Sequence, residues 1–220
     1  MERTPEPQLM DDFEQARAYA LADFEEPHNQ FIELFRQRFP EEPVEGVVLD
    51  LGCGTGDITK RFAYAFPACR IHAVDGAEQM LMFARQTVDF EMLHERVRLF
   101  KRLLPTGKLA KDNYDVVISN SLLHHLDDPM VLWRSVNRFA KEGGVVFVMD
   151  LMRPGSPAEA EAMVTSYSAN EPEVLQRDFY NSLLAAYTPD EVREQLVRAG
   201  LSQLKVETVS DRHLVISGRK

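Results

Sequence analysis

The stretch VVLDLGCGTGDIT, residues 47–59, decides the fold. Its first five residues are apolar apart from one aspartate, which is typical of a short buried strand, and residues 57–66 have the pattern of a helix. Three glycines lie in between, and they allow a sharp turn and let backbone N–H groups approach a ligand closely. The stretch therefore predicts a strand, a tight turn and a helix, with a ligand site at the turn.

Strand-like and helix-like segments alternate along the rest of the chain. Short apolar or β-branched runs predict four more strands, at 69–75, around 97–100, at 114–120 and at 145–150. Helical spacing and capping residues predict the other helices, at 11–26, 29–39, 76–88, 131–140 and 188–201. We expect Asp127-Asp128-Pro129 to begin the helix at 131–140 and Gly143-Gly144 to close it.

The end of the chain differs from this alternation. Residues 204–210 and 213–218 flank a short turn and predict a closing hairpin. We therefore expect an α/β fold with one Rossmann-like, doubly wound, mostly parallel sheet of seven strands, whose last strand is antiparallel and whose two faces both carry helices. Ligands of such sheets bind beyond the carboxyl ends of the strands, so the site should follow the first, second and fourth strands.

Composition favours one globular domain over residues 1–220, with 45% hydrophobic residues and a formal charge of −10. That charge repels polyanions, so we expect no nucleic acid partner. We also expect no membrane partner, since no apolar stretch approaches the roughly 18 residues of a membrane helix. A start without a secretory pattern and two cysteines read as reduced, Cys53 and Cys69, indicate the cytoplasm. Nothing in the sequence specifies an oligomeric state.

The spacing of the glycines limits which classes of ligand the loop can bind. A dinucleotide fingerprint runs G-x-G-x-x-G and binds a pyrophosphate, whereas Gly52, Gly54 and Gly56 form G-x-G-x-G. Asp50 lies just before this loop, and an anionic ligand would be poorly placed beside its carboxylate. The loop suits a ligand that brings a positive charge.

These residues resemble the class I S-adenosylmethionine-dependent methyltransferase family. The resemblance covers about residues 44–150 and 188–218, because VVLDLGCGTGDIT, Asp75 and YDVVISNSLLHHLDDP occur in the family's order. It implies that the cofactor is S-adenosylmethionine, that Asp50 acts on its amino acid part and that Asp75 accepts hydrogen bonds from its ribose hydroxyls. The other cofactor contacts that we expect are Gly52, Cys53, Gly54, Gly56, Gly76, Met80, Arg102, Leu103, Asn120 and Ser121.

The segment after the third strand departs from the family pattern. Members often carry an acidic residue there that binds the adenine amino group, but this chain has Lys101 and Arg102 in LFKRLLPTG. Cations cannot accept a hydrogen bond from that group. We therefore expect adenine to be recognised by main-chain groups near Arg102 and Leu103.

The pair His124 and His125 raises the question of a metal. Adjacent helical residues point apart, and no cysteine or carboxylate recurs at ligand spacing, so we predict no metal site and metal-independent cofactor binding. His124 lies just beyond the fourth strand, where a cleft-facing imidazole can contact substrate or accept a proton. We expect His124 to be the candidate catalytic residue.

Two regions are extra to the predicted core of strands and helices, an N-terminal helical cap at 1–43 and an inserted helical cap at 152–187. Methyl transfer requires alignment and exclusion of water, so both segments should cover the strand ends. The expected substrate contacts are Tyr19, His28, Arg153 and Tyr180, with Arg153 as the partner of an acidic group on the substrate.

We therefore predict methyl transfer from S-adenosylmethionine to a small molecule, by in-line displacement in an enclosed pocket. A nicotinamide-dependent oxidoreductase is one alternative, because it shares the sheet and an acidic ribose residue, although the G-x-G-x-G order counts against it. A non-catalytic cofactor-binding regulatory protein is another alternative, because retained binding residues do not require turnover.

Overall fold

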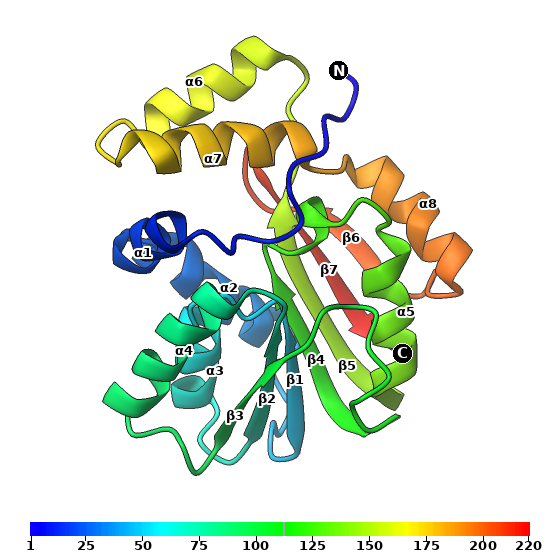
Figure 1. Cartoon of the computed structure of the whole chain (residues 1–220). Coiled ribbons are helices and arrows are strands. Elements are labelled where there is room, and N and C mark those ends of the chain that lie inside the picture. Colours follow the sequence, from blue (N-terminus) through cyan, green and yellow to red (C-terminus); the bar gives the residue numbers. More distant parts are fainter. Residues whose placement is uncertain (112) are drawn as a thin grey trace.

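The protein is built around one seven-stranded sheet with the order β3-β2-β1-β4-β5-β7-β6 (Figure 1). The structure is a computed structural model, which describes residues 1–111 and 113–220. The strands are β1 (Val47–Leu51), β2 (Arg70–Asp75), β3 (Val97–Lys101), β4 (Tyr114–Asn120), β5 (Ala140–Leu151), β6 (Lys205–Thr208) and β7 (His213–Arg219).

The strand directions confirm the predicted fold class. Strands β1 to β5 pair in parallel, whereas β7 pairs antiparallel with both β5 and β6. The strand order reverses between β1 and β4, because β2 and β3 lie on one side of β1 and the later strands lie on the other. This switch point is where doubly wound sheets bind their ligands.

Helices cover both faces of the sheet. On one face lie α2 (Glu25–Arg38), α3 (Asp57–Ala65) and α4 (Glu78–Phe90), and the apolar core between them and the sheet includes Phe31, Phe35, Phe62 and Phe147. On the other face lie α5 (Met130–Phe139) and α8 (Pro189–Ala199), which pack through Trp133. The two cores are fully buried and hold the strand ends in fixed positions.

A third group of helices lies over the carboxyl ends of the parallel strands (Figure 1). It consists of α6 (Pro157–Tyr167), α7 (Glu173–Ala185) and α1 (Phe13–Leu21), and the short 3-10 helix η1 (Leu123–His125) lies beneath α7. Residues 1–12, which we call the strap, run in extended form between this group and the sheet. The strap is tied to α7 by a hydrogen bond of 3.0 Å from the Thr4 amide to the Leu184 carbonyl.

The predicted cap at 1–43 is wrong for its second half. Helix α2 packs on the sheet, with Phe31 and Phe35 in the main core, and only its first turn, residues 25–28, reaches the strand ends that α1 and the strap cover. The helix predicted at 11–26 is also interrupted, because α1 ends at Leu21 and α2 begins at Glu25.

The boundary between α5 and β5 also differs from the prediction. Helix α5 ends at Phe139, and Gly143 and Gly144 lie inside β5 instead of closing the helix. The pairing of β4 with β5 shifts register between Tyr114 and Val116, and Gly143 has a φ of +73°. A glycine that accepts the left-handed conformation allows this irregular segment to continue as a strand.

Candidate active site

A cavity of about 630 Å³ lies at the carboxyl ends of the parallel strands, beneath α1 and α7. Its lining combines the glycine loop after β1, the ends of β2, β4 and β5, the helix η1 and part of the strap. The cavity therefore occupies the switch point of the sheet and the space under the third group of helices.

The glycine loop forms one wall of the cavity. The amides of Gly52 and Cys53 both donate to the Val74 carbonyl, at 2.8 and 3.0 Å, which ties the loop to the end of β2. Gly54 has a φ of +53°, and a Cβ atom there would meet nothing within 4 Å. Gly56 has a φ of +83° and lets α3 approach α4 closely. The loop thus combines strained backbone, which favours glycine, with open space at Gly54.

Asp50 lies at the base of this wall and is almost completely buried. Its carboxylate accepts a hydrogen bond from the Thr59 hydroxyl on α3. Burial raises the pKa of Asp50 to about 7, and the hydrogen bond from Thr59 opposes that shift only in part. The site therefore holds a carboxyl whose charge is costly unless a cation lies beside it.

Asp75 ends β2 and is fixed by two main-chain amides. Its Oδ2 accepts from Gly54 at 2.9 Å and its Oδ1 accepts from Ala77 at 2.8 Å. Burial raises its pKa above the ordinary value, and these hydrogen bonds oppose the shift. Gly76 follows, and a Cβ there would clash with Leu9 of the strap at 2.8 Å. The strap thus covers the cavity directly beside Asp75.

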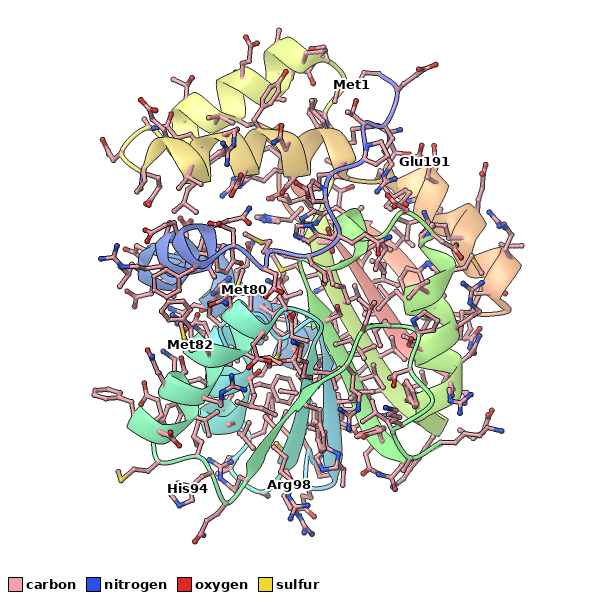
Figure 2. All side chains as sticks on the ribbon, in the orientation of Figure 1. Met1, Met80, Met82, His94, Arg98 and Glu191 are labelled. Carbon is pink, nitrogen blue, oxygen red and sulfur yellow. The ribbon has the colours of Figure 1, made fainter. Side chains whose placement is uncertain are left out.

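The expected adenine region lies between α4 and the segment after β3. Arg102 and Leu103 both line the cavity, as does Met80, which lies at the start of α4 beside α1 (Figure 2). The Arg102 amide donates to the Asp75 carbonyl at 2.8 Å, so that main-chain donor is already engaged. Leu103, which is 59% exposed, remains as the other main-chain candidate.

The end of β4 supplies Asn120 and Ser121. Both line the cavity, and the Asn120 amide donates to the Ser121 hydroxyl at 3.2 Å. Ser121 has a φ of +53° and its own amide donates to the Met149 carbonyl of β5. A non-glycine residue held in this conformation is a local strain that the surrounding pairing enforces.

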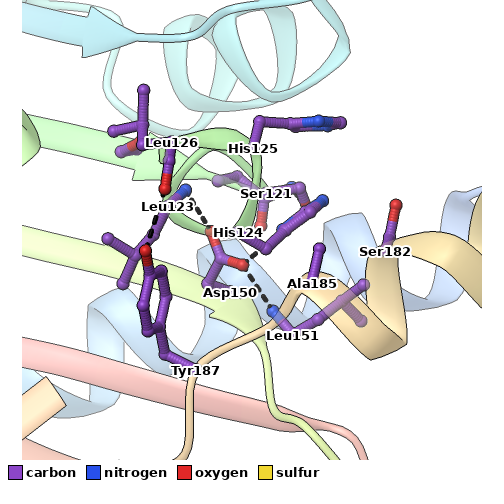
Figure 3. Close-up of polar contacts among 12 residues, drawn as sticks. Ser121, Leu123, His124, His125, Leu126, Asp150, Leu151, Ser182, Ala185 and Tyr187 are labelled. Carbon is purple, nitrogen blue, oxygen red and sulfur yellow. Dashed lines mark hydrogen bonds and ion pairs between the residues drawn. The ribbon is translucent and has the colours of Figure 1, made fainter. Parts of the chain in front are cut away.

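The candidate catalytic residue His124 is buried under α7 (Figure 3). Its Nδ1 lies 2.5 Å from Oδ1 of Asp150 at the end of β5, and its Nε2 lies 3.5 Å from Oε1 of Glu6 in the strap. Burial lowers the pKa of His124, but the attraction and hydrogen bond of Asp150 outweigh it and leave a raised pKa. Asp150 also accepts from the Leu123 and Leu151 amides, so the pair is rigidly placed.

The two adjacent histidines do not point apart, contrary to the prediction from the sequence. They lie in a 3-10 helix, and the rings of His124 and His125 are 4.3 Å apart. Nδ1 of His125 lies 3.2 Å from Oε1 of Glu6, the same oxygen that faces His124. The tight turn of the 3-10 helix therefore brings both rings to one carboxylate.

Two of the four expected substrate contacts line the cavity. Tyr19 of α1 is enclosed there, and burial, followed by the charge of Asp57, raises its pKa to about 12. His28 of α2 also lines the cavity, but its Nδ1 lies 2.6 Å from Oδ2 of Asp57. Asp57 additionally pairs with Lys60 and Arg61, so its pKa falls despite burial.

The other two expected contacts are placed elsewhere, and both predictions need correction. Arg153 lies outside the cavity lining, where it pairs with Glu191 at 2.6 Å and donates to the Ala186 carbonyl at 3.1 Å. Tyr180 packs into the small apolar core between α6 and α7. Arg153 is held away from the cavity by Glu191, which lies far along the chain. Tyr180 is held away because it packs between two helices.

Several residues in or beside the cavity wall escaped the sequence reasoning. Asp150 has a recognisable signal, because it is an acidic residue at the end of a predicted parallel strand, as Asp50 and Asp75 are. Glu6 has no such signal, since the strap has neither strand nor helix periodicity. Ser182, which donates to Oε1 of Glu6 at 3.0 Å, lies within the expected cap but was not singled out.

Comparison with known proteins agrees with this geometry. The family model described as a methyltransferase domain matches residues 49–146. A malonyl-[acyl-carrier protein] O-methyltransferase from Bacillus cytotoxicus is 36% identical over 101 residues, which are 46% of this chain and 34% of that protein. A ubiquinone biosynthesis O-methyltransferase from Bordetella pertussis is 35% identical over 109 residues, which are 48% of this chain and 43% of that protein.

Solved structures share the fold at low sequence identity. A SAM-dependent methyltransferase from Aquifex aeolicus superposes with a TM-score of 0.68 at 17% identity, covering 94% of this chain and 99% of that chain. A Haemonchus contortus phosphoethanolamine N-methyltransferase, in complex with phosphomonomethylethanolamine and S-adenosylhomocysteine, gives 0.64 at 20% identity, covering 82% of this chain and 38% of that chain.

Fold and site together define a Rossmann-like domain with a glycine loop and an acidic strand end at its switch point. Residues 49–146 match the methyltransferase domain family, and the fold of the chain is that of SAM-dependent methyltransferases. The chain spans less than half the length of the two curated relatives named above.

Proposed function

We propose that this protein transfers a methyl group from S-adenosylmethionine to a small-molecule acceptor enclosed beneath α1, α7 and the strap. The observation that carries the proposal is the carboxylate of Asp75, which two amides hold at the end of β2 inside a cavity. A fixed, ionisable acceptor at that position suits a vicinal diol of ribose.

The residues present fit S-adenosylmethionine. The open space at Gly54 leaves room for a chain-like group. In the part of the chain that the structure describes, no cation shifts the pKa of buried Asp50, and the amino end of the cofactor can supply one. When bound, S-adenosylmethionine supplies a methyl group on a positively charged sulfur. Asp50, Asp75 and the loop amides bind and orient it, while Asn120 and Ser121 lie at the neighbouring strand end.

The acceptor is proposed to lie on the side of the cavity toward α7 and η1. Tyr19, His28 and His124 line the cavity, and a hydrogen bond from Ser182 of α7 to Glu6 joins α7 to the strap. His124 lines the cavity, and its Nε2, with the carboxylate of Glu6 at 3.5 Å behind it, can receive the acceptor's polar end. Close placement and exclusion of water supply most of what an in-line displacement needs.

The nicotinamide alternative has less support. The loop places Asp50 where a pyrophosphate would need neutral or positive groups, and the G-x-G-x-G order does not match the dinucleotide fingerprint. The small-molecule acceptor rests on the enclosed cavity, and the exclusion of nucleic acid rests on the net charge.

A cytoplasmic location is also proposed. Both cysteines, Cys53 and Cys69, are free and buried, which suits a reducing compartment. In the described parts of the chain, no helix combines the length and apolar character needed to cross a bilayer.

Calorimetry with S-adenosylhomocysteine tests the cofactor assignment. Asp75→Ala should weaken binding by about 1.5–3 kcal/mol, roughly 10- to 150-fold, because it removes a charged acceptor from the ribose. Glu78→Gln is the matched control: Glu78 lies three residues away, outside the cavity lining, and pairs with Arg85 and Lys101. Unchanged affinity in Asp75→Ala, or tighter binding of NAD than of S-adenosylhomocysteine, would contradict the proposal.

A further inference from the structure

Three side chains from two distant parts of the sequence bring their metal-ligating atoms together at the acceptor side of the cavity. They are Glu6 of the strap and the adjacent pair His124 and His125 of η1. One ligand atom from each lies within 4.8 Å of the others, and Oε1 of Glu6 is 3.2 Å from Nδ1 of His125 and 3.5 Å from Nε2 of His124. We call this group the Glu6–His124–His125 cluster.

The remaining hydrogen bonds leave these three atoms turned toward one another. Asp150 engages Nδ1 of His124, so Nε2 is the nitrogen that faces Glu6. Nδ1 of His125 is buried and has no hydrogen-bond partner among residues 1–111 and 113–220, although Oε1 of Glu6 is only 3.2 Å away. A proton shared between these two atoms therefore does not account for their approach, because the alignment is not that of a hydrogen bond.

A metal ion accounts for the same arrangement. Zinc binds histidine nitrogen and carboxylate oxygen at about 2.0–2.2 Å, so two of its ligands at a tetrahedral angle lie roughly 3.4 Å apart. The two distances from Oε1 of Glu6, 3.2 and 3.5 Å, bracket that value. Two imidazoles and one carboxylate are also the ligand types that first-row transition metals accept.

The surroundings provide the support that such a site needs. Asp150 holds Nδ1 of His124 at 2.5 Å, which is the carboxylate–histidine–metal arrangement that fixes the ring and its tautomer. Glu6 and Asp150 together carry two negative charges against a divalent cation. The nearby guanidinium of Arg3 is engaged by the carbonyls of Ala185, His124 and Leu126. Both histidines line the cavity, so an ion bound to them has positions open to a substrate.

We propose that Glu6, His124 and His125 form a binding site for a divalent first-row transition metal ion, with Asp150 orienting His124. The open positions face the acceptor side, so the ion would bind an acceptor through an ionisable oxygen. This use of the site rests on the proposed methyl transfer, whereas binding of the ion does not. Cofactor contacts lie elsewhere in the cavity, and the prediction of metal-independent cofactor binding is unaffected.

The experiment uses the full chain, stripped with a chelator and titrated with Zn²⁺ without cofactor. Calorimetry and metal analysis after desalting should give one Zn²⁺ per chain, and Zn²⁺ should raise the thermal midpoint. Glu6→Gln and His125→Gln each remove one ligand and should weaken binding at least about 100-fold, since loss of an outer-shell partner alone costs roughly 10- to 100-fold. Asp150→Asn removes only an outer-shell partner and should weaken Zn²⁺ binding by about 10- to 100-fold.

His94→Gln is the matched control, because His94 is an exposed histidine far from the cavity, in the turn before β3 (Figure 2). It should bind Zn²⁺ as the unchanged protein does. No stoichiometric binding by the unchanged protein, or equal binding in Glu6→Gln and His125→Gln, would overturn the proposal. S-adenosylhomocysteine binding, measured on the same proteins without Zn²⁺, tests the proposed function separately. Failure of the metal site would therefore not contradict the proposed methyl transfer, and failure of cofactor binding would not contradict the metal site.

Discussion

At the scale of single residues, Asp50 connects the fold to the cofactor. The sheet buries this carboxyl and raises its pKa to about 7 from an ordinary value near 3.8. A group whose pKa is raised by folding binds more protons in the folded state, so the stability of the protein without cofactor should fall as pH rises from about 4 to 7. A cofactor that brings a cation offsets this cost, because it stabilises the charged form.

Cofactor affinity should therefore increase with pH as Asp50 ionises. We expect S-adenosylhomocysteine to bind more weakly below pH 7 and to reach its full affinity above it, as calorimetry across pH 5.5–8 would measure. Thr59→Val removes the hydroxyl that stabilises the carboxylate, so the midpoint should move to higher pH. Thr87→Val removes a hydroxyl bonded to Thr55 instead and should leave the midpoint in place. A pH-independent affinity in the unchanged protein would contradict this account.

The residues that sequence reasoning placed well are those tied to regular elements. Asp50 and Asp75 line the cavity because both lie at or near the end of a parallel strand, and the strand pattern is local. Arg153 and Glu6 depend instead on contacts with distant segments: Arg153 pairs with a residue 38 positions later, and Glu6 faces residues more than 100 positions later. No local pattern carries that information.

At the scale of elements, the strap closes the cavity through a small number of strong contacts. Arg3 donates to Ala185 of α7 at 2.5 Å and to His124 and Leu126 around η1 at 2.8 and 3.1 Å. Its guanidinium also lies 4.3 Å from the ring centroid of Tyr187. The Arg3 side chain thus joins the strap to both α7 and η1.

Arg3→Ala should loosen this whole region. Loss of these charge-assisted hydrogen bonds leaves three carbonyls with one partner fewer and should cost about 1–3 kcal/mol, which lowers the thermal midpoint by several degrees. Limited proteolysis should also cut residues 152–187 faster. Arg17→Ala is the control and should change neither, because Arg17 is an exposed residue of α1 whose ion pair with Glu14 is also exposed. Equal behaviour of the two variants would show that Arg3 does not hold the strap.

Helix patterns predicted where helices form but not which surface each one covers. The first 43 positions were expected to form one cap, yet Phe31 and Phe35 of α2 complete the sheet core while Tyr19 of α1 lines the cavity. An apolar stripe shows only that a helix packs against something. The break between Leu21 and Glu25 sends the two helices to different surfaces.

At the scale of the whole molecule, negative charge dominates and continues to the mouth of the cavity. The formal charge is −10, and the lining includes five acidic residues of α2, α7 and the segments before them, namely Asp23, Glu25, Glu26, Glu171 and Asp178. Arginines in the lining are Arg102 and Arg212, of which Arg212 pairs with Asp211. The net negative charge and these acidic side chains would repel a phosphate backbone that approached the cavity.

We therefore expect the protein not to bind nucleic acid. Proteins that do so without sequence preference use clustered lysine and arginine and reach dissociation constants of about 10⁻⁴ to 10⁻⁶ M at physiological salt. Fluorescence anisotropy with labelled single-stranded RNA and duplex DNA should give weaker binding than that range at 150 mM salt. Lowering the salt should add little, because few counterions are displaced when few phosphates are neutralised. A submicromolar complex that weakens steeply with salt would contradict both this expectation and the enclosed small-molecule site, since a polyanion would then have to reach the methyl donor through an acidic entrance.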